Sequence, residues 1–115
     1  MSENEQLLSL ITELRRGSLT LAVLGCLKEP RYGYALLQTL QEQGIDIEAN
    51  TLYPLLRRLD SQGVLVSDWD VSENRPRKYY SISDKGLLIF NRLMEEWAKM
   101  NKSIDSICGK DKSDE

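Results

Sequence analysis

The sequence contains no histidine and only two cysteines among its 115 residues. The absence of histidine excludes imidazole acid-base catalysis, histidine-assisted nucleophiles and histidine metal sites. Cys26 lies inside an apolar run and Cys108 lies near the end, so their spacing fits neither a metal site nor a disulfide framework. We therefore expect no metal and no cofactor, and we interpret Cys26 as a small core residue.

Long apolar segments are also missing. No apolar run approaches the roughly 20 residues that cross a bilayer, and residues 1–5 are acidic where a signal peptide would be basic. The sequence has no recognisable nucleophile–base pair, no paired carboxylates in an apolar setting and no glycine-rich phosphate loop. We expect a cytoplasmic protein that is not an enzyme and does not contact a membrane.

The length fits a single domain that can bury a modest core without disulfides or metals. The net charge of -3, from 15 Lys plus Arg and 18 Asp plus Glu, argues against a uniformly basic nucleic-acid binder. Acidic residues gather at the two ends, however, whereas five cations lie in the middle: Arg57, Arg58, Arg75, Arg77 and Lys78. Such a local basic face on an acidic protein can still bind phosphates.

The first quarter of the sequence is rich in leucine at helical spacing. Residues 5–14 predict a helix that Gly17 weakens or ends, after which Ser18 caps a new helix or marks a kink. Residues 19–27 are almost wholly apolar and predict a buried core helix that stops near Pro30. This segment should form the centre of the fold.

A second helix is predicted over residues 32–43. Gly44 suits the left-handed position that follows a helix, and residues 45–48 alternate like a small strand or an extended link. The link leads directly into the segment that carries the strongest functional signal.

That segment, residues 50–59, separates apolar and polar residues onto opposite sides of a helix. Its inward stripe consists of Leu52, Leu55, Leu56 and Leu59. Its outward face consists of Asn50, Tyr53, Pro54 and Arg57, flanked by Thr51 and Arg58. Asn50 is a good N-cap, and short polar groups followed by arginines suit a helix in the DNA major groove. We interpret Asn50, Thr51, Tyr53, Arg57 and Arg58 as candidate DNA contacts, with a solvated surface helix as the alternative.

A β-hairpin follows the third helix. Residues 64–70 and 78–83 are β-rich and flank a polar turn at 71–76, and Trp69 is expected to cover the core. Three helices followed by a hairpin predict a winged helix-turn-helix, a mainly α fold with a small β-hairpin.

The hairpin is strongly basic at its turn. Arg75, Arg77 and Lys78 are expected to contact the DNA backbone or minor groove, which gives affinity and register but little sequence information. Tyr34, at the start of the second helix, is a further candidate phosphate contact. The alternative is a solvated turn that the nearby Glu73, Asp68 and Asp70 partly neutralise.

The last helix, predicted over residues 85–107 with Ser83 as its cap, is too long to pack wholly on so small a domain. Apolar residues recur along it at alternating steps of three and four: Phe90, Leu93, Trp97, Met100, Ile104 and Ile107. This is the spacing of a coiled-coil seam, so we expect a homodimer. A helix folded back on its own domain is the alternative. The first helix would add Leu7, Ile11 and Leu14 to the dimer interface.

Four spaced motifs carry a family resemblance: residues 15–19, 32–36, 50–59 with Gly63, and 75–80 followed by 83–86. Together they resemble the PadR family of bacterial transcriptional regulators over about residues 14–86. The single C-terminal helix with Trp97 is similar to the short subfamily that includes multidrug-sensing repressors. The resemblance implies a winged helix-turn-helix domain over 14–84, dimerisation helices over 1–13 and 85–108, and a charged tail over 109–115 that we expect to be disordered.

The resemblance also implies a function. A homodimeric repressor would release a palindromic operator in double-stranded DNA when a small hydrophobic or aromatic compound binds between the tryptophans of the two C-terminal helices. Beside Trp97, the candidate ligand-binding residues are Met94, Met100, Asn101, Leu19 and Val23. Trp97 could instead only fill the dimer seam. A rival hypothesis, suggested by the acidic net charge, is a winged-helix module that binds protein and not DNA.

Overall fold

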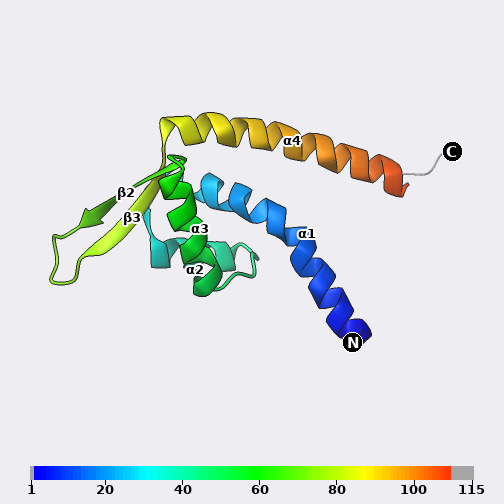
Figure 1. Ribbon diagram of the computed structural model, residues 1–115, viewed down its shortest axis with the longest axis horizontal. Helices are drawn as coiled ribbons and strands as arrows, with labels where there is room; N and C mark the ends of the chain where they lie inside the picture. Colours follow the sequence, from blue (N-terminus) through cyan, green and yellow to red (C-terminus); the bar gives the residue numbers. More distant parts are fainter. Residues whose placement is uncertain (1, 110–115) are drawn as a thin grey trace.

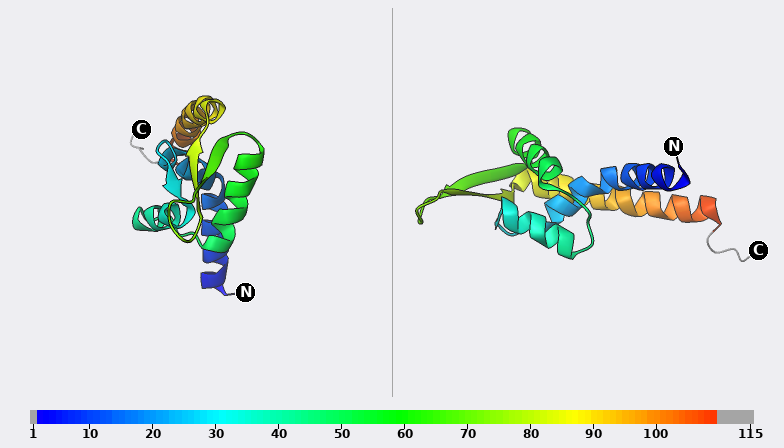
Figure 2. Two further views of the ribbon diagram at one scale, coloured as in Figure 1. Left: turned by 90° about the vertical axis from the view of Figure 1, so that its left-hand side faces the viewer. Right: turned by 90° about the horizontal axis from the view of Figure 1, so that it is seen from below.

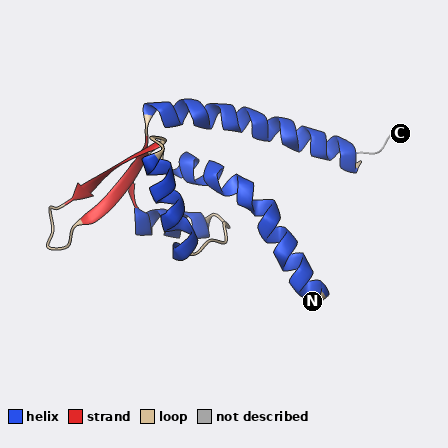
Figure 3. Ribbon diagram, in the orientation of Figure 1, coloured by secondary structure: helices blue, strands red, loops and turns tan. Residues whose placement is uncertain are grey.

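The computed structural model describes residues 2–109. Its elements are, in chain order, α1 (Glu3–Cys26), β1 (Arg31–Tyr32), α2 (Gly33–Glu42), α3 (Ala49–Ser61), β2 (Leu65–Asp70), β3 (Arg77–Ile82) and α4 (Asp84–Cys108). The second half of α1, the helices α2 and α3 and the hairpin gather at one end of the molecule (Figures 1 and 3). The mainly α fold with a small hairpin is confirmed. The tail expected to be disordered lies, from residue 110 on, outside the described residues.

Helix α1 is continuous through Gly17, so the prediction that this glycine could end the helix is wrong. One glycine costs an α-helix only about 1 kcal/mol, and a capping box starts the helix, in which Ser2 Oγ accepts a hydrogen bond from the Glu5 amide at 3.1 Å. Ser18 caps no new helix, because its hydroxyl donates to the Arg15 carbonyl at 3.0 Å. A bend near the middle of α1 remains (Figure 1).

The core forms where the second half of α1 meets α2, α3 and the sheet. Its buried members are Val23, Leu24, Leu27, Leu36, Leu40, Ile47, Leu52, Leu55, Leu56, Leu59, Val64, Leu65, Tyr80 and Phe90. All four leucines of the predicted α3 stripe are among them, which confirms that stripe. Burial of one such side chain contributes about 1.5–3 kcal/mol, so the stripe fixes which side of α3 faces outward.

The sheet has the strand order β1-β3-β2 and is antiparallel throughout. The hairpin prediction is confirmed, whereas β1 was not predicted and residues 45–48 form an extended link without a strand. Trp69 is 56% exposed, so the expectation that it covers the core is wrong. In the register it lies opposite Lys78, one pair before the turn, where the hairpin extends away from the helices (Figure 2).

The junction between the hairpin and α4 is tightly built. Ser83 Oγ accepts a hydrogen bond from the Gly86 amide at 2.9 Å, which confirms the predicted cap, and donates to the Gly63 carbonyl at 2.6 Å. A Cβ on Gly86 would collide with the Val64 carbonyl oxygen. The backbone of α4 therefore leaves the sheet at a fixed position.

Helices α1 and α4 extend well beyond the domain formed by the core and the hairpin (Figure 1). The molecule measures 62 × 37 × 23 Å with a radius of gyration of 17.3 Å, whereas a compact chain of this length would have roughly 13 Å. Only Gly86 and Phe90 are buried in α4. Among the described residues, none of the helices is long and apolar enough to cross a membrane.

Phe90 corrects part of the predicted seam. It is 7% exposed and lies in the core of its own protomer, 3.6 Å from the position that a Cβ on Gly25 would take. Lys28 Nζ lies 4.7 Å from the centroid of its ring. Phe90 therefore has almost no surface left for a partner, and the exposed part of the seam begins at Leu93.

Candidate nucleic-acid interface

Helix α3 starts two residues earlier than the predicted cap at Asn50 implies. Glu48 is the N-cap, and its carbonyl accepts hydrogen bonds from the amides of Thr51 and Leu52, both at 3.0 Å. The prediction that Asn50 caps this helix is therefore wrong. As a consequence, the Asn50 side chain lies exposed in the first turn and is not used by the helix backbone.

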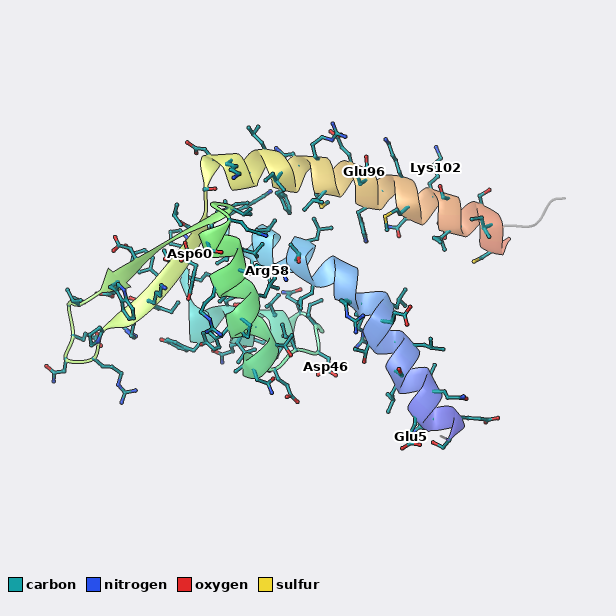
Figure 4. All side chains as sticks on the ribbon, in the orientation of Figure 1. Glu5, Asp46, Arg58, Asp60, Glu96 and Lys102 are labelled. Carbon is teal, nitrogen blue, oxygen red and sulfur yellow. The ribbon has the colours of Figure 1, made fainter. Side chains whose placement is uncertain are left out.

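The outward face of α3 carries exposed polar and charged side chains: Asn50, Thr51, Arg57 and Arg58. Neither arginine forms an ion pair with any residue between 2 and 109. Arg58 can be followed on α3 in Figure 4. Guanidinium groups in this state can bind guanine or phosphate without first breaking an internal contact.

Tyr53, predicted to contact DNA, also has a packing contact within the chain. It is half-buried, and its ring lies over Gly33, where a Cβ would come within 2.6 Å of Tyr53 Cε1 and 3.0 Å of its hydroxyl oxygen. Tyr53 thus packs α3 against the first residue of α2. Sequence analysis missed the requirement for glycine at this position, which only the crossing of the two helices reveals.

The hairpin formed by β2, β3 and the turn between them is called the wing from here on. It carries a cluster of side chains around Arg77. The guanidinium carbon of Arg77 lies 4.3 Å from the centroid of the Tyr32 ring, which in turn stacks on Tyr34 with centroids 5.9 Å apart. Arg77 Nη1 donates a hydrogen bond to Tyr34 Oη at 3.3 Å. Arg77 Nη2 lies 3.9 Å from Asp70 Oδ2 and 3.6 Å from Glu73 Oε1. We call these five residues the Arg77 clamp.

Asp70 is the most strongly held acid of the wing. Its Oδ1 accepts hydrogen bonds from Ser72 Oγ at 2.6 Å and from the Ser72 amide at 3.0 Å, and its Oδ2 accepts one from Tyr32 Oη. These bonds, with that from the Ser72 hydroxyl first, lower the pKa of Asp70 to about 2. The hydrogen bond that Tyr32 donates to Asp70 also raises the pKa of Tyr32. Asp70 therefore stays ionised beside Arg77.

Lys78 lies on the other face of the hairpin and is also partnered. Its Nζ lies 3.9 Å from Asp60 Oδ2, and it lies 5.7 Å and 5.6 Å from the ring centroids of Trp69 and Tyr80. Asp60, labelled in Figure 4 near the end of α3, also accepts a hydrogen bond from Ser67 Oγ at 2.6 Å. This contact joins the last turn of α3 to the wing.

The three cations predicted on the wing therefore differ. Arg75 is exposed in the turn and forms no ion pair within the described part of the chain, whereas Arg77 and Lys78 are half-buried and partnered. The sequence predicted partial neutralisation by Glu73, Asp68 and Asp70, and the structure pairs Glu73 and Asp70 with Arg77. The sequence did not predict Asp60 as the partner of Lys78. One signal was present, since Asp70 and Arg77 flank the turn at positions that an antiparallel hairpin places opposite each other.

The residues predicted to bind a ligand lie mainly on α4. Trp97 is 43% exposed, and Met94, Met100 and Asn101 are also exposed. Leu19 is half-buried and lines a groove of about 360 Å³ between α1 and the α2–α3 link, which none of these four α4 residues reaches. Val23 is 0% exposed, so its assignment to the ligand site is corrected: it is a core residue with no surface for a ligand.

The remaining residues of the predicted dimer interface are largely exposed in the single chain. Apart from half-buried Ile11 they are Leu7, Leu14, Leu93, Trp97, Met100, Ile104 and Ile107. Most of their apolar surface is therefore left uncovered in the single chain.

Comparison with known proteins agrees with this architecture. The model of the family described as "Transcriptional regulator PadR-like family" matches residues 21–91. The chain belongs to this PadR-like family. A PadR family transcriptional regulator from Eggerthella lenta has a crystal structure with a TM-score of 0.88 and 43% identity, covering 96% of each chain. A PadR-like transcriptional regulator from Bacillus cereus is 25% identical with a TM-score of 0.75, covering 84% of this chain and 96% of that one.

A relative found by sequence similarity is also named as a transcriptional regulator. The transcriptional regulator Rv3488 of Mycobacterium tuberculosis is 37% identical over 71 residues, which are 59% of this chain and 66% of that protein. PadR membership implies DNA-binding regulation.

Proposed function

We propose that this PadR-like chain is a homodimeric repressor that binds a palindromic operator through α3 and the wing and is released by a small hydrophobic or aromatic compound. The observation that carries the DNA-binding part is the exposed polar face of α3, held outward by the buried leucine stripe on its other side. A helix so oriented can enter the major groove without any rearrangement of the core.

The contacts divide by their chemistry. Asn50, Thr51, Arg57 and Arg58 reach base edges or the adjacent phosphates from α3, because amide and guanidinium groups pair with adenine and guanine edges. Arg75 contacts the backbone beside the major groove. Four further candidates lie at the edges of this surface and already have intramolecular contacts: Tyr34, Tyr53, Arg77 and Lys78.

The dimer is supported by the apolar surfaces of α1 and α4. Leu14 is 80% exposed and Ile107 is 79% exposed, at positions that a second copy would cover. Helices of this length without a partner would expose a continuous apolar stripe to water. Sedimentation should give a dimer at micromolar concentration, and a monomer there would contradict the proposal.

Regulation would follow from the geometry of the dimer. Two α3 helices must lie about one helical turn of DNA apart, ~34 Å, or a multiple of this. A ligand acts as an inducer only if it binds the DNA-incompetent spacing more tightly than the competent one. The candidate site consists of Trp97, Met94, Met100 and Asn101 on α4, with Leu19 as the remaining contribution from α1, because aromatic and thioether groups adapt to flat apolar compounds.

The ligand step can be followed through Trp97 itself. A Trp69→Phe variant leaves Trp97 as the sole tryptophan of the chain, so quenching by a planar aromatic compound reports on this site alone. We expect the same compound concentration to quench fluorescence and to release DNA. Quenching without release would contradict the switch and leave Trp97 as a residue of the dimer seam.

The DNA-binding step is tested by a mobility-shift assay on the DNA upstream of the gene, with a random duplex of equal length as control. Each protomer offers several free cations, so affinity should fall by orders of magnitude between low and physiological salt. No binding to either duplex at low salt would contradict the proposal and favour a winged-helix module that binds protein.

A further inference from the structure

The Arg77 clamp joins two elements that the backbone connects only weakly. Strand β1 pairs with β3 through Arg31 and Tyr32 alone, so few backbone hydrogen bonds hold the start of α2 to the hairpin. Across this junction the clamp adds a cation–π contact between Arg77 and Tyr32, a hydrogen bond from Tyr32 to Asp70 and one from Arg77 to Tyr34. Its two ion pairs lie within the hairpin and hold the Arg77 guanidinium in place. Side chains therefore supply much of what sets the angle of the wing.

The guanidinium of Arg77 is contacted on one face and at both terminal nitrogens, and the side chain is 30% exposed. One face lies on the Tyr32 ring, Nη1 donates to Tyr34, and Nη2 lies between two carboxylates. Its Nε is buried and makes no hydrogen bond within the described structure. A guanidinium that binds a phosphate needs N–H groups free to face it, whereas Nη1 and Nη2 of Arg77 already have partners within the clamp.

Arg75 provides the contrast within the same hairpin. It lies two residues away, is exposed and forms no ion pair in the described part of the chain. A phosphate can therefore reach Arg75 without breaking a contact, whereas Arg77 would first have to leave two carboxylates and an aromatic face.

We propose that Arg77 is a positioning residue: it locks the wing to the start of α2, so that Arg75 is presented to the DNA backbone, and it does not itself contact phosphate. This inference rests on the DNA binding proposed above. The cations of the basic turn then have different roles: Arg75 contacts the DNA backbone, and Arg77 holds Arg75 in place.

The shape of Arg77, and not its charge, is then what matters. Lysine keeps the charge and binds phosphate well as a point charge, but it lacks the planar fork that stacks and pairs in the clamp. We expect Arg77→Lys and Arg77→Gln to weaken binding to a random duplex to the same extent, by about tenfold. Near wild-type affinity in Arg77→Lys with a loss confined to Arg77→Gln would overturn the proposal.

Asp70→Asn gives a prediction of opposite sign under the two hypotheses. If Arg77 contacts phosphate, removal of the competing carboxylate should strengthen binding to DNA. If Asp70 holds the clamp, its removal should weaken binding, by a few-fold. The matched control is Asp68→Asn, which removes the same charge from the same strand without a contact to Arg77 and should bind slightly more tightly than the wild type.

A double-mutant cycle of Arg77→Lys with Arg75→Ala tests whether Arg77 acts through Arg75. If Arg77 acts by presenting Arg75, Arg77→Lys should cost about tenfold in the wild-type background and less than about twofold in Arg75→Ala. Independent phosphate contacts would give additive losses, and a general weakening of the fold would reduce affinity equally in both backgrounds. Either of these results would overturn the proposal.

The contribution of the clamp to the stability of the wing can also be tested in the absence of DNA. Amide hydrogen exchange in the outer pairs of the hairpin, Trp69↔Lys78 and Asp70↔Arg77, should speed up in Arg77→Lys and Asp70→Asn but not in Asp68→Asn. Unchanged exchange in all three would overturn the clamp even if DNA binding holds. If the wild-type protein binds no DNA, the proposed function fails, whereas faster exchange would still establish the lock.

Discussion

The outward face of α3 and the wing carry cations of different kinds. Arg57 and Arg58 are exposed and form no ion pair with the described residues, whereas Arg77 and Lys78 are half-buried and tied to carboxylates and aromatic rings. Cations that look alike in the sequence are thus free in one region of the folded chain and paired in the other. The difference teaches that the number of cations in a hairpin overstates how many of them are available to DNA.

The largest effect is expected from removing the free cations of α3. The double substitution of Arg57→Ala and Arg58→Ala should weaken operator binding by about a hundredfold or more, since each base-contacting arginine contributes roughly 1–3 kcal/mol. A mobility-shift titration measures this loss. The unfolding midpoint should hardly change, because both side chains are exposed.

The control for this substitution lies on α4. Arg92→Ala with Lys99→Ala removes the same charge from exposed residues that pair with glutamates on their own helix. Its affinity should stay within a few-fold of the wild type. Equal losses in the two double variants would mean that net charge, and not the α3 face, governs binding.

A smaller effect is expected at the crossing of α2 and α3, where Tyr53 packs over Gly33. In Gly33→Ala the new Cβ would lie 2.6 Å from Tyr53 Cε1, so the ring must swing away and the contact between α2 and α3 loosens. We expect a loss of about 1–3 kcal/mol in the free energy of unfolding and a roughly tenfold loss of affinity. Urea unfolding and the shift assay measure the two losses.

Gly17→Ala is the matched control for Gly33→Ala. Nothing lies within 4 Å of a Cβ at Gly17, and the residue is inside α1. Alanine should therefore stabilise the fold by about 0.5–1 kcal/mol. If Gly33→Ala behaved in the same way, Tyr53 would not be holding the two helices together.

The smallest effect is a dependence of the wing on acidic pH. Hydrogen bonds from Ser72 and Tyr32 lower the pKa of Asp70 from its ordinary value of 3.8 to about 2. Its contribution to stability is therefore present above about pH 4 and is lost as the pH falls through about 2. The difference in unfolding free energy between the wild type and Asp70→Asn should shrink over this range. A difference that stays constant from pH 5 to pH 2, measured by urea unfolding, would argue against the clamp.

The elements of the fold follow from apolar spacing because burial decides them. The α3 stripe, the hairpin and the Ser83 cap are local patterns, and each is confirmed. The end of a helix depends on neighbouring elements as well, so Gly17 misled the prediction for α1.

The candidate site was less predictable, for a physical reason. Which cations remain free depends on contacts between residues far apart in sequence, such as Tyr32 with Asp70 and Asp60 with Lys78. Val23 and Phe90 show the same limit, since an apolar position in a helical pattern does not reveal whether its own core or a partner covers it.

The central claim is that α3 reads sequence and the wing adds affinity. The most direct test is the ratio of operator affinity to random-duplex affinity in Arg57→Ala and in Arg75→Ala, at one salt concentration. The ratio should fall by about tenfold or more in Arg57→Ala and stay unchanged in Arg75→Ala, which should weaken binding to both duplexes alike. An unchanged ratio in Arg57→Ala, or a ratio that falls only in Arg75→Ala, would contradict this division of roles.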